Sequence, residues 1–149
     1  MVRYAPFFGA LPYFATASKY FILYREGESQ TMKDYTAANI RNIGIFGHGG
    51  EGKTTLTEAM LFNAGLVERL GRVENGTTTT DYDPEEVKRT ISINAALAPL
   101  EWKDVKLNII DAPGFFDFYG EVTAAMALAD SALIVVGAVS GPVVGTEKA

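Results

Sequence analysis

The 149-residue sequence contains no cysteine and only one histidine. The absence of cysteine excludes a disulfide framework, a thiolate zinc site and a cysteine nucleophile, and it is consistent with a reducing compartment. Basic residues are also scarce, since 13 Lys and Arg stand against 18 Asp and Glu for a net charge of −5. This acidic balance argues against a module that coats DNA or RNA, and no sequence-specific nucleic-acid binding is inferred.

The sequence also lacks a long apolar run. No segment approaches the roughly 18 consecutive apolar residues that a membrane-spanning helix needs, so no membrane association is predicted. With 48% hydrophobic and 21% charged residues, the composition is that of one globular domain with a core. It is not the composition of a disordered chain.

The first 31 residues differ from the rest because they hold 8 of the 17 aromatic residues without helical or alternating periodicity. One interpretation is a secretory signal, with an apolar stretch followed by small residues at 15–17 as a cleavage site. Pro6 and Pro12 interrupt that stretch. We therefore favour Met32 as the natural start, with residues 1–31 a translated leader or a disordered extension.

From residue 42 the pattern alternates between strand and helix. The predicted strands are 42–46, 91–97, 105–110 and 132–139, the last of them fully buried and parallel to its neighbour. A first helix is predicted over 53–64, with Gly65 as its stop, and a second around the apolar stripe of Val122, Ala125, Met126 and Ala129. This order predicts an α/β fold.

Three connecting features complete this prediction. In the strand at 91–97, alternation places Ile91, Ile93, Ala95 and Leu97 on the buried face, and Pro99 beyond it suits an edge position. Lys103-Asp104 suits a tight hairpin turn. The polar residues 74–90 predict a mobile loop.

Residues 47–54, Gly-His-Gly-Gly-Glu-Gly-Lys-Thr, satisfy the pattern G-x-x-x-x-G-K-[ST] between a predicted strand and a predicted helix. The glycines let backbone N–H groups turn toward an anion at the positive end of the helix dipole. Lys53 supplies a flexible charge for the β- and γ-phosphates, and the Thr54 hydroxyl can bind Mg²⁺. We expect His48 to contribute only its backbone and the Glu51 side chain to face solvent. The pattern predicts nucleotide binding.

A second pattern, Asp111-Ala112-Pro113-Gly114, follows the predicted strand 105–110. It lies at the carboxyl edge of the strand, where ligands of open α/β sheets bind. A carboxylate there can hold Mg²⁺ through a water molecule, and the Gly114 N–H can meet a γ-phosphate. A four-residue pattern such as D-x-x-G often occurs by chance. Here it follows a phosphate loop along the chain and ends a predicted strand, which makes the match specific.

Residues 42–146 resemble the start of the GTP-binding domain of elongation factor G and the ribosomal-protection proteins, a group of translational GTPases. The segments that carry the resemblance are 41–45, 47–55, 78–83, 89–93, 108–114, 117–118 and 121–122. It implies a P-loop NTPase fold with three layers and a mostly parallel sheet. Residues 32–149 would be the N-terminal part of that domain, truncated before the last strands. No Asn-Lys-x-Asp segment, which reads guanine in the family, occurs in the sequence.

The resemblance also implies a function. GTP and Mg²⁺ would be the cofactors, and a cytoplasmic GTPase would couple GTP binding and hydrolysis to action on the ribosome in elongation or translocation. Residues 74–93 would be switch I and residues 111–121 switch II, both ordered around the γ-phosphate. The implied catalytic residues are Lys53 and Gly114. The implied metal ligands are Thr54, Ser92 and Asp111. The implied nucleotide-binding residues are Gly47, His48, Gly49, Gly50, Glu51, Gly52, Lys53, Thr54, Thr55, Asp111 and Gly114.

The sequence departs from the family pattern at three positions. Ser92 replaces the usual metal-binding threonine and keeps its hydroxyl, whereas Gly50 stands where many members have an aspartate. Phe115 replaces the histidine that positions the attacking water, and a phenyl ring can neither donate nor accept that hydrogen bond. Because positioning groups contribute roughly 10² to 10⁴ in rate, hydrolysis is expected to be slowed. The chain is most similar to a divergent branch of elongation factor G-like proteins with an aromatic residue in this slot.

Two alternatives stay open at this point. Phe115 favours a hydrolysis-impaired, nucleotide-gated ribosome-binding module. Residues 49–55 also resemble the loop of partition-type ATPases, but those enzymes carry a signature lysine where this chain has His48 and lack the pattern at 81–92.

Overall fold

The computed structural model describes residues 33–149, which form one compact unit, Lys33–Ala149. The expectations for the aromatic-rich segment 1–31 lie outside the described residues.

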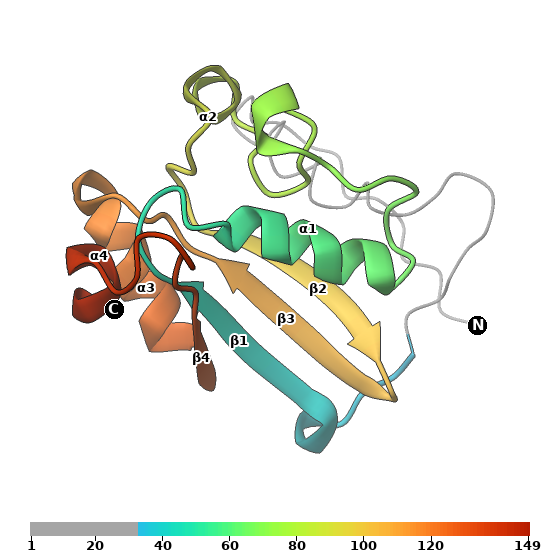
Figure 1. The fold of residues 1–149 in the computed structure, drawn as a ribbon. Coiled ribbons are helices and arrows are strands. Elements are labelled where there is room, and N and C mark those ends of the chain that lie inside the picture. Colours follow the sequence, from blue (N-terminus) through green and yellow to red (C-terminus); the bar gives the residue numbers. More distant parts are fainter. Residues whose placement is uncertain (1–32) are drawn as a thin grey trace, which may run out of the picture. The chain divides into compact units, whose positions relative to one another are not determined.

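Four strands form one mixed sheet in the order β2-β3-β1-β4 (Figure 1). The strands are β1 (Ile40–Phe46), β2 (Ala96–Trp102), β3 (Val105–Asp111) and β4 (Ser131–Ile134). Strand β1 runs parallel to both β3 and β4, and β2 pairs antiparallel with β3. The predicted α/β fold with a mostly parallel sheet is confirmed.

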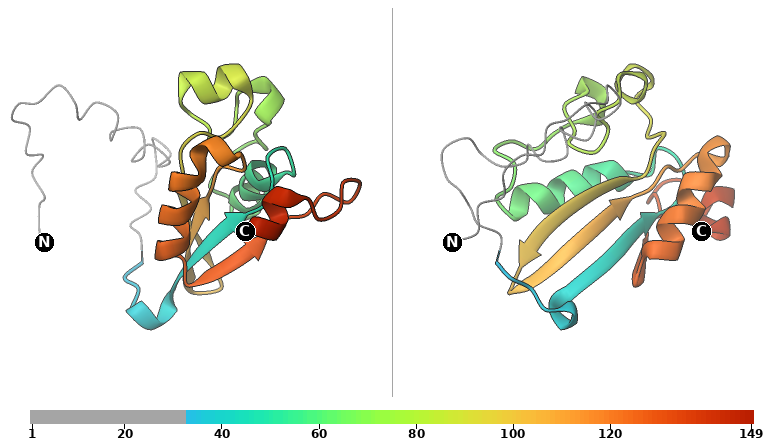
Figure 2. Two further views of the ribbon diagram at one scale, coloured as in Figure 1. Left: turned by 90° about the vertical axis from the view of Figure 1, so that its left-hand side faces the viewer. Right: turned by 180° about the vertical axis from the view of Figure 1, so that it is seen from behind.

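Helices cover both faces of the sheet, which gives three layers (Figure 2). Helix α1 (Lys53–Asn63) packs on one face and α3 (Tyr119–Leu128) on the other. The core on the α1 side contains Ile45, Leu61, Ala98, Leu100 and Ile109. The core on the α3 side contains Phe46, Ile110, Ala112, Val122 and Ala125. Because successive strand residues point to opposite faces, β1 and β3 end in continuous apolar runs that serve both layers.

Helix α1 begins and ends close to where the sequence predicts. Gly52, with φ 93°, precedes its first turn. At the other end Gly65 adopts φ 74°, and the N–H groups of Gly65 and Leu66 donate to the carbonyls of Phe62 and Leu61. This is the Schellman arrangement, which explains why a glycine stops the helix there.

The predicted hairpin is also confirmed. Lys103 and Asp104 have φ values of 48° and 63°, and Trp102 pairs with Val105 across the turn. Two positive φ angles give a loop whose twist matches that of the flanking strands. The apolar stripe on α3 faces the core as predicted, with Val122 and Ala125 buried.

The predicted strand at 91–97 is wrong in position and in face. Strand β2 begins at Ala96, and its buried residues are Ala96, Ala98 and Leu100, whereas Leu97 is 52% exposed. Pairing starts opposite the last residue of β3, Asp111, so residues 91–95 have no neighbouring strand. Pro99 does lie in an edge strand, as predicted.

The predicted loop at 74–90 contains helix. A 3₁₀ turn, η3 (Val73–Asn75), is followed by helix α2 (Pro84–Arg89). Asp83 caps α2 through the N–H of Glu85, and the Glu86 carboxylate accepts the Asp83 N–H in return. This capping box stabilises a helix of only six residues.

The prediction of a buried strand at 132–139 is wrong in extent and burial. Strand β4 has four residues, all exposed, and within residues 33–149 it pairs only with β1. An edge position leaves its apolar side chains uncovered on one side. The remaining short elements are η2 (Ala37–Asn39), η4 (Phe116–Phe118) and α4 (Val144–Lys148). Between residues 33 and 149 no helix has the length and apolarity to cross a bilayer.

Candidate functional site

Residues 47–52 connect β1 to α1 at the carboxyl edge of the parallel strands (Figure 1). Gly47, Gly50 and Gly52 have φ values of 140°, 79° and 93°, which side chains disfavour. This backbone path requires glycine at those positions. Loops of this kind turn successive N–H groups to one side and so form an anion-binding concavity.

Lys53 lies inside this loop, with only 6% of its surface exposed. Its Nζ donates to the His48 carbonyl oxygen at 2.8 Å. Burial lowers the pKa of Lys53, against the attraction of Asp111, Glu51 and Asp81. A buried ammonium with one protein acceptor retains two N–H groups for an anion.

Asp111 ends β3 and is 1% exposed. Its Oδ2 accepts a hydrogen bond from the Thr80 hydroxyl at 2.9 Å, whereas its Oδ1 is buried without a partner. Burial raises the pKa of Asp111 to about 6, and hydrogen bonds from the Thr54 and Thr80 hydroxyls oppose that rise. The unpartnered oxygen is suited to a cation or to a cation-bound water.

Thr54 and Ser92 meet beside this carboxylate. Their hydroxyl oxygens lie 3.1 Å apart. Adjacent oxygens of an octahedral Mg²⁺ site are about 3.0 Å apart when the metal–oxygen distance is near 2.1 Å. The hydroxyl pair therefore has a spacing that one Mg²⁺ ion can bridge.

Asp81 is a further polar group at this site. It is 5% exposed, and its Oδ2 is buried without a partner. Burial raises the pKa of Asp81, and a hydrogen bond with the Ser92 side chain opposes this. Within residues 33–149 no group of three or more His, Asp or Glu residues could hold a metal alone. Two hydroxyls and two carboxylates fit Mg²⁺, which keeps waters and phosphate oxygens among its ligands.

Gly114 lies against the phosphate loop. A Cβ at this position would overlap the Lys53 Nζ and approach the Gly49 nitrogen to 2.5 Å. Only glycine fits there. The Gly114 backbone therefore lies close to any anion that the Lys53 ammonium binds. The next residue, Phe115, packs its ring on Gly49, where an added Cβ would lie 2.5 Å from ring carbons.

Three predicted residues point away from this centre. The His48 Nδ1 is buried without a partner and faces Gly145, and the His48 ring lies 6.2 Å from that of Phe115. Glu51 does not simply face solvent as expected, because its carboxylate accepts a hydrogen bond from Ser140 at 2.8 Å. Loop 137–141 lies beside it and supplies that donor. Thr55 is exposed on α1.

The structure therefore brings Lys53, Thr54, Ser92, Asp111 and Gly114 together. Sequence reasoning missed Thr80 and Asp81 as parts of the site. The available signal was a polar run of four threonines and an aspartate that ends two residues before Asp83, the N-cap of α2.

A glycine-rich loop between strand and helix, a buried lysine and threonine, and a carboxylate ending the neighbouring parallel strand define a P-loop nucleotide-binding domain. Residues 38–149 match the family described as elongation factor Tu GTP binding domain. The chain belongs to that family.

Individual relatives are similar over most of this chain. It is 44% identical over 118 residues to mitochondrial ribosome-releasing factor 2 of Candida albicans, covering 79% of the chain and 15% of the relative. It is 45% identical over 110 residues to elongation factor G of Granulibacter bethesdensis, covering 74% and 16%. The chain thus spans about 15% of the length of the curated relatives it matches.

Solved structures agree with this assignment. A crystal structure of a protein from Thermus thermophilus, 48% identical, superposes with a TM-score of 0.72 over 75% of this chain and 17% of that protein. The bacterial selenocysteine-specific elongation factor EF-Sec, 28% identical, gives a TM-score of 0.57 over 72% and 16%. The predicted P-loop fold is confirmed.

Proposed function

We propose that this chain binds GTP with Mg²⁺ and that, in the intact protein, nucleotide state controls action on the ribosome during translation. The observation that carries the proposal is the convergence of Lys53, Thr54, Ser92 and Asp111 from separate segments of the chain. Family membership and the relatives named for elongation and ribosome release support the ribosomal part of the proposal.

Each residue has a distinct task in this proposal. Lys53 and the N–H groups of residues 47–54 bind the β- and γ-phosphate oxygens. The hydroxyls of Thr54 and Ser92 would be direct ligands of Mg²⁺, and the Asp111 and Asp81 carboxylates would accept hydrogen bonds from its water ligands. When bound, Mg²⁺ neutralises phosphate charge and orients the terminal phosphate. The Gly114 N–H donates to the γ-phosphate, so its position reports whether that phosphate is present.

This arrangement predicts how nucleotide state reaches the rest of the protein. Ser92 and Gly114 lie in different segments, and both would lose a partner when the γ-phosphate leaves. The intact protein should associate with ribosomes more tightly with a non-hydrolysable GTP analogue than with GDP. Equal association with both nucleotides, measured by co-sedimentation, would contradict the proposal.

A second candidate function follows from Phe115. Its ring packs on Gly49 and cannot hydrogen-bond to an attacking water. The intact protein would then act as a nucleotide-gated ribosome-binding module with little turnover. The Phe115→His variant should raise ribosome-stimulated GTP turnover by one or more orders of magnitude, since positioning groups contribute roughly 10² to 10⁴. Unchanged turnover would mean that another group already orients the water.

Nucleotide preference and compartment need their own tests. Family membership favours GTP over the ATP that a partition-type ATPase would use, and competition between the two nucleotides for the intact protein decides the matter. Cytoplasmic location stays our prediction, although several relatives are named as mitochondrial. Cell fractionation with an antibody against the intact protein distinguishes the two compartments.

A further inference from the structure

Glu86 is a buried carboxylate next to the segment that carries Ser92. It lies on α2 and is 1% exposed. Its Oε1 accepts the N–H groups of Ile93 and Asn94, each at 2.9 Å. Its Oε2 accepts the Asp83 N–H at 3.1 Å. Three main-chain donors therefore converge on one charged group, and two of them directly follow Ser92.

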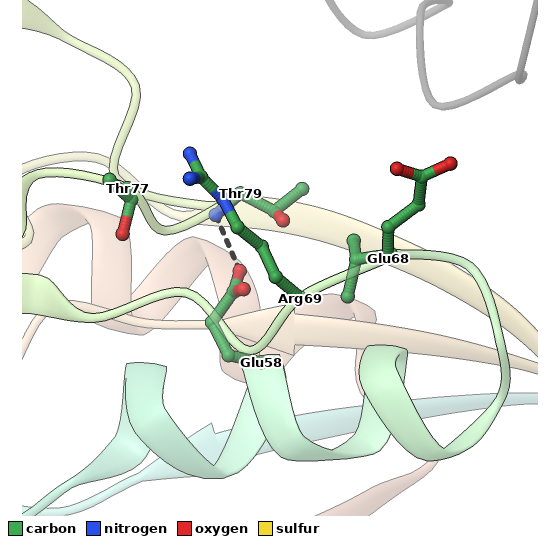
Figure 3. Close-up of a pocket in the computed structure, with 6 residues that line it drawn as sticks. Glu58, Glu68, Arg69, Thr77 and Thr79 are labelled. Carbon is green, nitrogen blue, oxygen red and sulfur yellow. Dashed lines mark hydrogen bonds between the residues drawn. The ribbon is translucent and has the colours of Figure 1, made fainter.

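Glu58 binds the other end of residues 71–94 in the same way, because its buried carboxylate also accepts main-chain N–H groups. It lies on α1 and is also 1% exposed. Its carboxylate accepts the N–H group of Thr79 (Figure 3). It also accepts the Gly71 N–H at 3.3 Å. The hollow of about 560 Å³ beside Glu58 is lined by Val67, Glu68, Arg69, Thr77 and Thr79. Thr79 is followed by Thr80, which donates to Asp111.

These contacts account for how residues 71–94 reach the site. Backbone hydrogen bonds to an ionised carboxylate are stronger than neutral ones. Losing the acceptor would leave the buried Gly71 N–H and the partly buried N–H groups of the other donors without this partner. The two carboxylates fix the backbone beside Thr80 and beside Ser92, two hydroxyls that face the site. The hydrogen bonds described for these carboxylates go to residues 71–94 and not to the phosphate loop.

We propose that Glu58 and Glu86 are positioning residues that hold residues 71–94 where Ser92, Thr80 and Asp81 face the Mg²⁺ site. This inference rests on the proposed function, because it assigns a cause to the geometry of that metal site. It adds two residues that touch neither metal nor nucleotide. Removing groups that orient metal ligands typically costs 10- to 100-fold in metal affinity.

The test uses the intact protein, a fluorescent GTP analogue, and the ratio of its Kd in EDTA to its Kd in Mg²⁺. We call this ratio the Mg²⁺ enhancement. Glu58→Met and Glu86→Met should each lower it by about tenfold or more. The Kd in EDTA should stay near that of the parent, because the phosphate loop is untouched.

Two further variants separate positioning from a general loss of stability. Glu86→Gln keeps an oxygen for the Ile93 and Asn94 donors and loses only the bond from Asp83, so it should retain most of the enhancement. Asp83→Ala removes the side-chain carboxylate that accepts the Glu85 N–H and caps α2. It should weaken α2 through loss of the cap and leave the enhancement unchanged.

The outcomes are distinguishable. If the parent binds the analogue with Mg²⁺ enhancement and either methionine variant stays within a factor of two of it, the positioning role is overturned while the proposed function stands. The positioning role is also overturned if Asp83→Ala lowers the Mg²⁺ enhancement as much as Glu86→Met does. If the parent shows no enhancement, both proposals fail.

Discussion

At neutral pH the buried Asp111 carboxylate should lower the stability of the nucleotide-free protein. Burial raises its pKa from 3.8 to about 6. Between these values the folded chain binds more protons than the unfolded chain, so the free energy of unfolding falls as pH rises from about 4 to about 6. The raised pKa of Asp81 acts in the same direction. At neutral pH the Asp111 charge costs up to about 3 kcal/mol, at 1.36 kcal/mol per pKa unit.

Asp111→Asn removes this charge while retaining an oxygen for the Thr80 hydroxyl. In EDTA and without nucleotide, amide hydrogen exchange in β3 should show a higher opening free energy at pH 7 in this variant. The gain should shrink as pH falls toward 4. Asp117→Asn, at an exposed position, is the matched control and should change stability by less than about 0.5 kcal/mol.

Asp111→Asn should also impair Mg²⁺-dependent nucleotide binding, so that in this variant stability rises while nucleotide binding falls. A lower opening free energy for Asp111→Asn, or a parent whose exchange is independent of pH in this window after correction for intrinsic rates, would refute the reasoning. Either result would mean that burial does not govern this carboxylate.

Two other substitutions test separate parts of the structure. Gly114→Ala should abolish high-affinity GTP analogue binding without unfolding the sheet, because its methyl group would overlap the Lys53 Nζ, and titration together with circular dichroism checks both statements. Thr90→Gly should stabilise α2 by about 1 kcal/mol, because Thr90 is β-branched and adopts φ 56° at the end of that helix. Hydrogen exchange of the α2 amides measures this gain, and slower opening in the parent than in the variant would contradict it.

Local patterns predicted the parts of the site that depend on neighbouring residues. The glycines of the phosphate loop, the Gly65 stop and the Lys103-Asp104 turn each need a backbone angle that a short sequence can encode. Asp111 was found because a carboxylate at the end of a parallel strand has a known place in α/β sheets.

Contacts between distant segments could not be predicted in this way. Thr80 reaches Asp111 across 31 positions, and no local periodicity marks that approach. The alternation at 91–97 indicated a strand, but the Ile93 and Asn94 N–H groups bind Glu86 instead of a neighbouring strand. The exposure of β4 depends on its place in the strand order, which its apolar sequence does not encode.

Isothermal titration calorimetry of the intact protein tests the central claim most directly. With GTP and Mg²⁺ we expect one saturable binding heat, a markedly weaker affinity in EDTA, and a further loss when Lys53 is replaced by alanine. The absence of any binding heat with guanine or adenine triphosphates, in the presence of Mg²⁺, would contradict the account.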